Sequence, residues 1–289
     1  MKVLITGASG LLGKALLETA SSKDEVHGTW FKNRPSGRYF LHQLDITSSS
    51  CVYQLVKAIK PDVIIHCAAE GRVDFAEKHY DAAFEINVTG THNVLRAAKE
   101  CWARVVYISS NAVFNGTLPP YDETSMKDPI NQYGTLKTLA ERLTKTSNGW
   151  LIVRPFLLYG WPNPGGRPNW ATIVIDKLSK GEELPMVDDV IWMPTYVKDC
   201  AEAIWNLIDL ENEIVHIAGP DRVSLMEFGR TVAQRFNLDA SLLTPVPSSY
   251  FPNMAPRPKD TTYNLSKAKE LGIECLGIEE GLRKMKEDQ

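Results

Sequence analysis

The sequence predicts an α/β fold in which helices cover both faces of a doubly wound parallel sheet. Short apolar runs of strand length alternate with segments whose apolar residues have helical spacing, which is typical of strand–helix–strand crossovers. A glycine-rich turn joins the first apolar run to the first helical segment. Together these observations indicate an open sheet whose loops gather at the carboxyl ends of its strands.

The apolar runs of the first half have the composition of strands buried on both faces of a sheet. They are Val3–Thr6, Val26–Trp30, Val63–Cys67, Val105–Ser109 and Leu151–Val153, and a further strand is expected just before Asp45. Helical spacing marks the segments between them, Leu11–Ala20, Cys51–Ile59, Ala76–Lys99 and Gln132–Thr146. Each connection between parallel strands requires a right-handed crossover, so the helices should cover both faces.

After Arg154 the pattern changes. Proline and glycine become dense in Trp161–Pro168 and again in Pro245–Pro258, which predicts loops over a site. Helices are expected between them at Ala171–Lys180, Val197–Ile208 and Ser224–Phe236.

The composition of the chain argues against several kinds of binding partner. The 289-residue chain has 44% hydrophobic and 23% charged residues and a formal net charge of −3, so it lacks the basic field that nucleic acids or acidic membranes would attract. No apolar run reaches the ~18–20 residues that span a bilayer, and the glycine turn comes too early for a signal peptide. The five cysteines are an odd number and include no CxxC pair, which argues against a disulfide framework and a zinc site. We expect a cytosolic protein without a metal or membrane partner.

The glycine turn has the spacing of a dinucleotide-binding loop. Gly7 permits the tight turn, Gly10 lets the backbone approach a pyrophosphate, and Gly13 allows close packing of helix on strand. The helix that follows would present its positive end to the phosphates. The candidate cofactor-binding residues here are Gly7, Ser9, Gly10, Leu11, Leu12 and Gly13. This Rossmann-type turn makes residues 1–154 the expected cofactor-binding domain, and residues 155–289 mainly a smaller substrate lobe with some segments that return to the first domain.

The end of the second strand favours NADP(H) over NAD(H). An NAD enzyme usually has an acid there for the ribose hydroxyls, whereas this chain has Lys32 and Arg34 after Trp30. Both cations would attract a 2′-phosphate, although they could also be solvated residues of a surface loop, and use of NAD(H) stays open. Asp45 and Ile46, after the third strand, are candidates for adenine contact, with an ordinary turn as the alternative for Asp45.

Tyr133 and Lys137 form a YxxxK pair, which places both side chains on one face of a predicted helix. A nearby ammonium lowers the pKa of a phenol and eases proton transfer, and the same Lys137 can hold the nicotinamide ribose. Ser110 follows a strand at the edge where open sheets bind ligands, so its hydroxyl could polarise a substrate carbonyl. Ser110 could instead cap a turn.

With these residues the chain resembles the extended short-chain dehydrogenases/reductases, and among them the dTDP-4-dehydrorhamnose reductases. The resemblance runs nearly end to end. It is carried by Cys67-Ala68-Ala69, Val73-Asp74-Phe75-Ala76-Glu77, Asn87-Val88-Thr89-Gly90, Ser109–Gly116, Pro129–Lys137, Arg154-Pro155, Leu158-Tyr159-Gly160, Asn169-Trp170, Val187-Asp188-Asp189, Pro194–Asp199 and Arg257-Pro258.

The resemblance implies site residues and an activity. Ser110, Tyr133 and Lys137 would be catalytic, Cys67, Ala68 and Ala69 would contact the cofactor, and the substrate would lie near Asp74, Asn111, Asn169, Trp170 and Arg257. Asp74 and Asn169 could instead be caps or turn residues, and Arg257 could bind the carbonyls of its own loop. The implied enzyme is an NADP(H)-dependent oxidoreductase that reduces the C4 keto group of a nucleotide-linked 6-deoxy-4-keto sugar, as in dTDP-rhamnose biosynthesis. A homodimer is a further expectation, since dimers are the commonest symmetric assemblies, although no interface is evident in the sequence.

Two departures from the reductase pattern affect the expected sugar pocket. Asn111 stands where the family often has Asp, and an amide cannot act as an acid or base. Glu70-Gly71-Arg72 replaces a polar, aromatic stretch. Two alternatives therefore stay open. One is a nucleotide-sugar epimerase or dehydratase, against which the lack of an acid near Trp30 counts. The other is a non-catalytic NADP-binding protein similar to the regulatory β subunit of methionine adenosyltransferase, which fold and cofactor site alone do not exclude.

Overall fold

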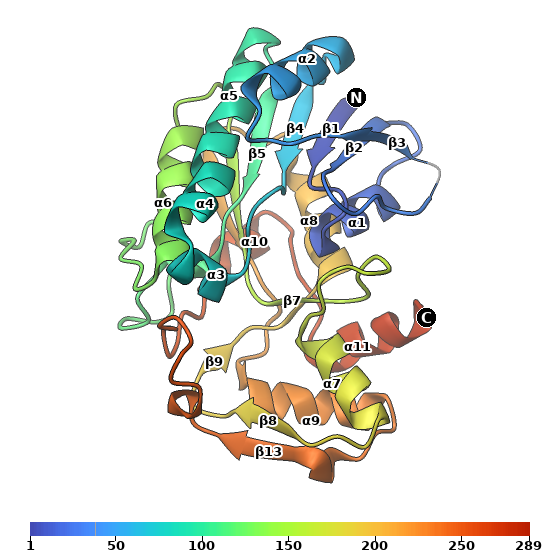
Figure 1. Cartoon of the computed structure of the whole chain (residues 1–289), viewed down its shortest axis with the longest axis vertical. Helices are drawn as coiled ribbons and strands as arrows, with labels where there is room; N and C mark the ends of the chain where they lie inside the picture. Colours follow the sequence, from blue (N-terminus) through green and yellow to red (C-terminus); the bar gives the residue numbers. More distant parts are fainter. Residues whose placement is uncertain (38) are drawn as a thin grey trace.

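The computed structural model describes residues 1–37 and 39–289 and has a seven-stranded sheet at its centre (Figure 1). The strand order is β11-β6-β5-β4-β1-β2-β3, and every pairing is parallel. The strands are β1 (Lys2–Thr6), β2 (Glu25–Trp30), β3 (Phe40–Gln43), β4 (Val63–His66), β5 (Arg104–Ile108), β6 (Leu151–Pro155) and β11 (Glu213–Ile217). The order reverses between β1 and β4, which makes the carboxyl ends of these two strands a topological switch point. The predicted doubly wound fold is confirmed.

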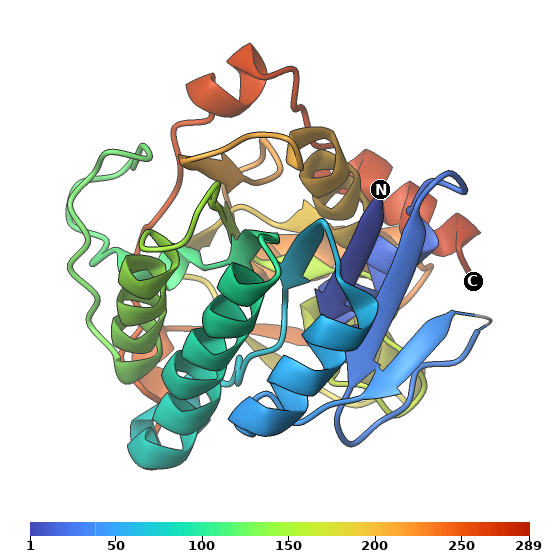
Figure 2. The ribbon, with the colours of Figure 1, turned by 90° about the horizontal axis from the view of Figure 1, so that it is seen from above.

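Helices cover both faces of the sheet, as Figure 2 shows from above. One layer consists of α2 (Ser49–Ile59), α5 (Gly90–Glu100) and α6 (Gln132–Thr144). The other consists of α1 (Leu11–Glu18), α8 (Val197–Leu207) and the short α10 (Ser266–Glu270). Apolar side chains of the strands alternate between the two layers, so Leu4 and Ile64 pack with α2 and α5, whereas Val3 and Ile65 pack with α1 and α8. Apolar clusters therefore lie on both faces of the sheet, as its sequence pattern predicts.

The predicted helix Ala76–Lys99 is not continuous. The structure divides this region into α3 (Val73–Lys78), α4 (Tyr80–Phe84), the π-helical turn η1 (Glu85–Thr89) and α5. The first break falls at His79, whose φ of −134° and ψ of 58° lie outside the helical region. The π turn contains Asn87, whose side chain is directed to the loop after β4. Apolar spacing could not reveal these breaks, because all the pieces bury one face against the same layer.

The C-terminal part below the sheet in Figure 1 has its own core. Its elements are β7 (Leu158–Tyr159), α7 (Trp170–Ser179), β8 (Leu184–Val187), β9 (Ile191–Trp192), β10 (Thr195–Tyr196), β12 (Val223–Ser224), α9 (Leu225–Arg235), β13 (Leu243–Val246) and α11 (Ile278–Glu287). The arrowheads of the sheet strands point toward this part, so the carboxyl edge of the sheet faces it. The predicted loop 161–168 is irregular, whereas the first residues of predicted loop 245–258 belong to β13, which pairs with β8.

Chain segments after residue 154 contribute to both parts. The strand β11 pairs with β6 at the edge of the large sheet, and α8 packs beside α1. Within the described residues no helix has the length and apolar character to cross a membrane.

Candidate functional site

The glycine turn lies at the switch point, and two of its glycines, Gly7 and Gly13, leave no room for a side chain. A Cβ on Gly7 would lie 2.7 Å from the Ala68 backbone, and Gly7 has a φ of +69° that favours glycine. A Cβ on Gly13 would lie 2.4 Å from the carbonyl oxygen of Gly7, so α1 packs directly on the turn. Gly10 is the N-cap of α1 and has no side chain over the helix end. The resulting cradle fits a dinucleotide pyrophosphate.

The remaining cofactor candidates of this turn surround the same helix end. Leu12 is buried against the sheet, and Leu11 packs at the edge of that cluster. The carbonyl oxygen of Ser9 accepts a hydrogen bond of 3.1 Å from the buried side chain of Asn163. This bond joins the glycine turn to loop 161–168 and fixes both.

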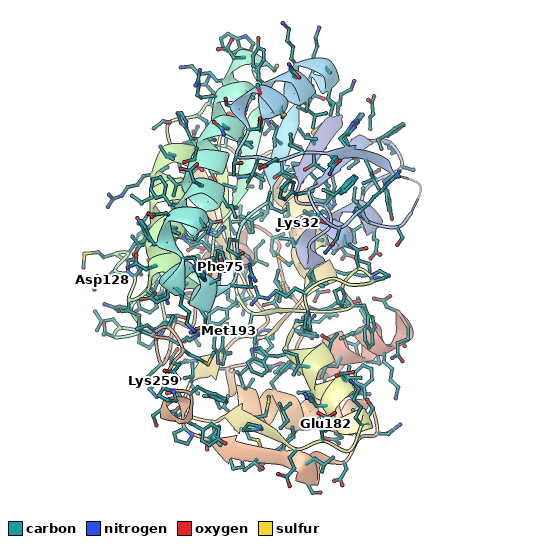
Figure 3. All side chains as sticks on the ribbon, viewed as in Figure 1. Lys32, Phe75, Asp128, Glu182, Met193 and Lys259 are labelled. Carbon is teal, nitrogen blue, oxygen red and sulfur yellow. The ribbon has the colours of Figure 1, made fainter. Side chains whose placement is uncertain are left out.

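Lys32 and Arg34 lie just beyond the carboxyl end of β2, and both are exposed (Figure 3 labels Lys32). Neither forms an ion pair with the residues that the structure describes. Asp45 accepts hydrogen bonds from the backbone and the hydroxyl of Thr47, which is the turn role left open by the sequence. The side chain of Ile46 is buried and packs where a Cβ on Gly90 would be, so only its backbone can face a ligand.

The loop after β4 holds Cys67, Ala68 and Ala69 directly beside the glycine turn. The amide of Ala68 donates to the hydroxyl of Thr6 at 3.3 Å. Buried Asn87 clamps the far end, since its side chain accepts from the Glu70 amide at 2.7 Å and donates to the Glu70 carbonyl at 3.0 Å. Burial raises the pKa of the Cys67 thiol to about 12, so this cysteine is uncharged at neutral pH.

Ser110, Tyr133 and Lys137 meet at the carboxyl end of β5. The Lys137 side chain is 3% exposed, and its ammonium donates to the carbonyl oxygen of Ile108 at 2.8 Å. The ammonium also lies 4.9 Å from the centre of the Tyr107 ring and 5.9 Å from that of Tyr133. Ser110 begins the 3₁₀ turn η2 (Asn111–Val113) and accepts from the Ala112 amide, so it also has the capping role that the sequence left open.

The charges of this group suit proton donation. Burial raises the pKa of Tyr133, although hydrogen bonding to Ser110 and the positive charge of Arg167 act in the opposite direction. Burial lowers the pKa of Lys137 to about 8, and its nearby acidic groups limit that shift. At neutral pH the phenol is therefore protonated and the lysine mostly charged.

Gly134 allows α6 to approach the serine turn. A Cβ on this residue would lie 2.1 Å from the carbonyl oxygen of Ala112 and 2.8 Å from Pro129. The helix begins at Asn131, whose side chain accepts from the Gly134 amide at 2.9 Å and donates to the Pro256 carbonyl. The close approach places Tyr133 beside Ser110.

Two predicted substrate residues bind each other. Asp74 on α3 accepts two hydrogen bonds from the Arg257 guanidinium, at 2.7 and 2.8 Å, and a third from the Ala255 amide. Arg257 also donates to the carbonyl of Ala255, as a loop cation would. These bonds lower the pKa of Asp74. The pair anchors the loop before residue 258 to α3 at one rim of the site.

The three other predicted substrate residues have different contacts. They are Asn111, Asn169 and Trp170. The Asn111 amide donates to the Thr261 hydroxyl at 2.8 Å, which ties the serine turn to the C-terminal segment. Asn169 caps α7 and donates to the carbonyl of Gly160 at 2.7 Å. Trp170 packs on the core of the C-terminal part. The structure thus brings Asn111 to the catalytic group and gives Asn169 and Trp170 local structural contacts.

The segment that departs from the reductase pattern is charged and internally paired. Glu70 accepts from the Arg72 guanidinium at 2.6 and 2.9 Å, and Arg72 stacks over Phe75 of α3 (labelled in Figure 3). Arg167 of loop 161–168 reaches this segment, since its Nη1 lies 3.5 Å from the place of a Cβ on Gly71. Burial opposes ionisation of Glu70, but its bonds with Arg72 lower its pKa, and the positive charge of Arg167 adds a smaller effect in the same direction. This cation beside Tyr133 gave no motif in the sequence.

This fold and this arrangement of residues define a Rossmann-type α/β protein with a Ser–Tyr–Lys group at the carboxyl edge of its sheet. The family described as RmlD substrate binding domain matches residues 1–289, and the chain belongs to that family. The resemblance found in the sequence is thereby confirmed.

Solved structures of dTDP-4-dehydrorhamnose reductases are similar to this chain over almost their whole length. A dTDP-4-dehydrorhamnose reductase from Bacillus anthracis str. Ames, in complex with NADP, is 33% identical with a TM-score of 0.88, over 100% of this chain and 99% of that chain. The Clostridium acetobutylicum ATCC 824 reductase is 29% identical with a TM-score of 0.87, over 99% of each chain. A UDP-glucose 4-epimerase from Thermus thermophilus, at 22% identity, shares the fold.

Curated relatives include a protein of a different kind. Methionine adenosyltransferase 2 subunit beta of Rattus norvegicus is 34% identical over 298 aligned positions, which cover 97% of this chain and 87% of that protein. The spore coat polysaccharide biosynthesis protein SpsK of Bacillus subtilis (strain 168) is 30% identical over 98% of this chain and 95% of its own length. Family membership therefore leaves catalysis open.

Sequence reasoning missed several residues that support the site. Asn87 and Gly134 lie in segments that carry the family resemblance, but their spacing in the sequence indicates no structural role for either residue. Glu141 and Asn93 gave no signal at all, although Asn93 donates to the carbonyls of Ile46 and Thr47 and fixes the loop after β3. Among the residues with described placement, no cluster of three or more acidic, cysteine or histidine side chains could hold a metal.

His66 makes protein stability depend on pH. Its ring lies between the hydroxyls of Thr6 and Thr91, and burial lowers its pKa to about 3. An unfolded histidine has a pKa of about 6.5, so between these values the unfolded chain binds more protons. The free energy of unfolding should therefore fall as pH drops below about 6.5, by about 1.4 kcal/mol per pH unit from this residue.

Urea unfolding of the wild type and of His66→Gln between pH 6.5 and 4.5 measures this contribution. We expect the variant to lose stability less steeply with falling pH, because its amide does not titrate. Equal slopes in the two proteins would contradict a buried neutral His66.

Proposed function

We propose that this protein is an NADP(H)-dependent reductase of the C4 keto group of a nucleotide-linked 6-deoxy-4-keto sugar, with dTDP-4-dehydrorhamnose as the leading substrate. The observation that carries the proposal is the meeting of Ser110, Tyr133 and Lys137 at the carboxyl end of β5, beside the glycine turn. Residues 1–154 would bind the cofactor and residues 155–289 would mainly bind the sugar nucleotide.

The glycine turn would hold the pyrophosphate, Lys32 and Arg34 the 2′-phosphate, and Lys137 the nicotinamide ribose. When bound, the reduced nicotinamide supplies the hydride. Tyr133 then has one task, to donate its phenolic proton to the oxygen of the reduced carbonyl. Its raised pKa keeps that proton in place at neutral pH, and the Lys137 ammonium stabilises the phenolate that remains. Ser110 would donate a hydrogen bond to the carbonyl oxygen.

Relatives support the proposal in part. The NADP complex of the Bacillus anthracis reductase is similar over the whole chain, which favours a nicotinamide cofactor here. The methionine adenosyltransferase subunits support a second proposal, a non-catalytic regulatory subunit. Intact Ser110, Tyr133 and Lys137 favour the enzyme. An epimerase is disfavoured, because the loop after β2 has cations in place of an acid.

The proposal is tested by NADPH consumption at 340 nm with enzymatically generated dTDP-4-dehydrorhamnose. We expect turnover that requires both the sugar nucleotide and NADPH. If NADPH binds but is not consumed, this substrate is excluded. Other nucleotide-linked keto-sugars would then be compared, together with binding to a methionine adenosyltransferase catalytic subunit.

The cations after β2 should select NADPH over NADH. The double substitution Lys32→Ala/Arg34→Ala should weaken NADPH binding by about 10-fold or more, because each cation can form a charge-assisted hydrogen bond with the 2′-phosphate. NADH binding should not change. The readout is the dissociation constant of each nucleotide from its fluorescence.

The matched control is Lys177→Ala/Lys180→Ala, which removes the same charge from the last turn of α7 and from the residue that follows this helix. Equal losses of NADPH affinity in both double variants would indicate a general charge effect and contradict a 2′-phosphate site. The predicted homodimer and cytosolic location stay predictions.

A further inference from the structure

A fully buried carboxylate lies behind the candidate catalytic group. Glu141 on α6 is 0% exposed, and its two oxygens accept hydrogen bonds from three side chains. The Arg154 guanidinium donates at 2.8 and 2.9 Å, the Lys127 ammonium at 2.8 Å and the Ser109 hydroxyl at 2.6 Å. The two cations lower the pKa of Glu141 to about 2 despite its burial, so it is charged at every physiological pH.

The bonds of Glu141 connect segments of the chain that contain candidate catalytic residues. Ser109 directly precedes Ser110 on the chain, and Glu141 follows Lys137 by one helical turn on α6. The end of β5 is therefore bound to α6 at two points. One is the bond from Ser109 to Glu141, and the other is the bond from Lys137 to the Ile108 carbonyl.

The side chains beyond Arg154 that surround the Glu141 ion pair are also buried. Nη1 of Arg154 lies 3.1 Å from Nε2 of His216 on β11, and the His216 ring stacks on Tyr263 with a centroid distance of 3.9 Å. Burial keeps the pKa of His216 well below its usual value, so the ring is neutral and does not compete with Arg154 for Glu141. Glu141 thus has a fixed set of partners.

A buried ion pair is a costly way to stabilise a fold. Apolar residues of similar volume often serve equally well, because both ions lose their hydration. The Glu141 bonds do, however, define one register between β5 and α6, which apolar packing would leave looser. The arrangement therefore suits a requirement for precise geometry at the strand end.

We propose that Glu141 is a positioning residue for the reductase reaction: through Ser109 and α6 it holds Ser110 and Lys137 in the arrangement that proton transfer from Tyr133 requires. This inference rests on the proposed function. It assigns Glu141 no contact with substrate or cofactor.

Glu141 also acts on the charge of Lys137. The groups that face this ammonium are Cys67 and His66 from the end of β4, Tyr107 from β5, and Tyr133 and Glu141 from α6. Cys67, His66 and both phenols are neutral at pH 7, because burial raises the pKa of the thiol and the phenols and lowers that of the imidazole. Glu141 is then the one permanent negative charge among these groups, and it favours the charged form of Lys137.

The first variant is Ser109→Ala, which removes one bond and leaves the ion pairs of Glu141 in place. We expect kcat to fall by about 10- to 100-fold with KM near the wild-type value, as for small misplacements of catalytic groups. Ser109→Thr, which retains the hydroxyl, should recover most of the loss. The matched control is Thr144→Val, which removes a buried hydroxyl from the same helix that donates to Ala140 and not to Glu141.

The second variant is Glu141→Gln/Arg154→Met, which removes both buried charges together so that neither remains unpaired. The readout is the pH dependence of NADPH affinity, which needs no sugar substrate. In the wild type, affinity should fall as pH rises through about 8, where Lys137 loses its proton. Without Glu141 that midpoint should shift to lower pH.

The outcomes separate this inference from the proposed function. A lowered NADPH midpoint in the double variant without turnover of any keto-sugar by the wild type would retain the Glu141–Lys137 link and refute the reductase. Turnover by the wild type, with Ser109→Ala equal to Thr144→Val in kcat and with an unshifted midpoint, would overturn the positioning role. Loss of kcat in Ser109→Ala that Ser109→Thr recovers would support it.

Discussion

Replacing Tyr133 by phenylalanine should lower kcat for the keto-sugar by about 10²- to 10⁴-fold, the range for loss of a general acid. The phenol keeps its proton at neutral pH and lies beside both Ser110 and the Lys137 ammonium, which can stabilise the phenolate after the transfer. The substitution retains the aromatic ring, so Ser110, Lys137 and the glycine turn should keep their places. NADPH affinity should therefore stay near the wild-type value.

Steady-state kinetics and NADPH binding measure the two parts of this expectation. The control is Tyr159→Phe, which removes a buried phenolic hydroxyl that has no hydrogen-bond partner among the described residues of the C-terminal part. Its kcat should be unchanged. A Tyr133→Phe protein with more than about a tenth of the wild-type kcat would require another proton donor.

Gly134→Ala should also lower kcat strongly. It should lower the melting temperature as well, which is opposite to the usual effect of this substitution in a helix. An alanine inside a helix normally stabilises it by about 1 kcal/mol relative to glycine. Here the new Cβ would lie 2.1 Å from a backbone oxygen, which cannot rotate away as a side chain can. Either α6 or the serine turn must move, which separates Tyr133 from Ser110. We expect a loss of about 100-fold in kcat and a lower melting temperature.

The matched control is Gly229→Ala on α9. There the nearest atom to the new Cβ is the end of the flexible Met186 side chain, at 2.9 Å. This variant should keep its activity and a melting temperature within a few degrees of the wild type. A Gly134→Ala protein as active and stable as Gly229→Ala would show that the close approach of α6 is not needed.

Local patterns predicted the fold and indicated the candidate site. The strands β1, β4, β5 and β6 are buried on both faces, so their apolar runs were clear in the sequence, and β2 is buried over most of its length. The short strands of the C-terminal part were not predicted, because two-residue strands such as β7 and β10 have no periodicity. Their pairing depends on contacts between distant segments.

The candidate site likewise contains residues that local motifs indicated and contacts between distant residues that the sequence could not indicate. Gly7, Tyr133 and Lys137 stand in motifs whose spacing reflects one turn or one helix, so the sequence alone indicated them. The bonds of Asp74 with Arg257 and of Ser109 with Glu141 join residues 183 and 32 positions apart, and no spacing rule reports such contacts. The position of Arg167 beside Tyr133 likewise depends on how loop 161–168 returns to the sheet.

Isotope transfer shows whether this chain reduces a nucleotide-linked keto-sugar, because the hydride of NADPH would end up on the sugar. NADPH deuterated on both faces of the nicotinamide C4 would be incubated with dTDP-4-dehydrorhamnose, and the sugar product analysed by mass spectrometry. We expect one deuterium at C4 of the sugar with the wild type and a much slower incorporation with Tyr133→Phe. A wild-type protein that binds NADPH and yields no deuterated sugar would refute the proposed reduction.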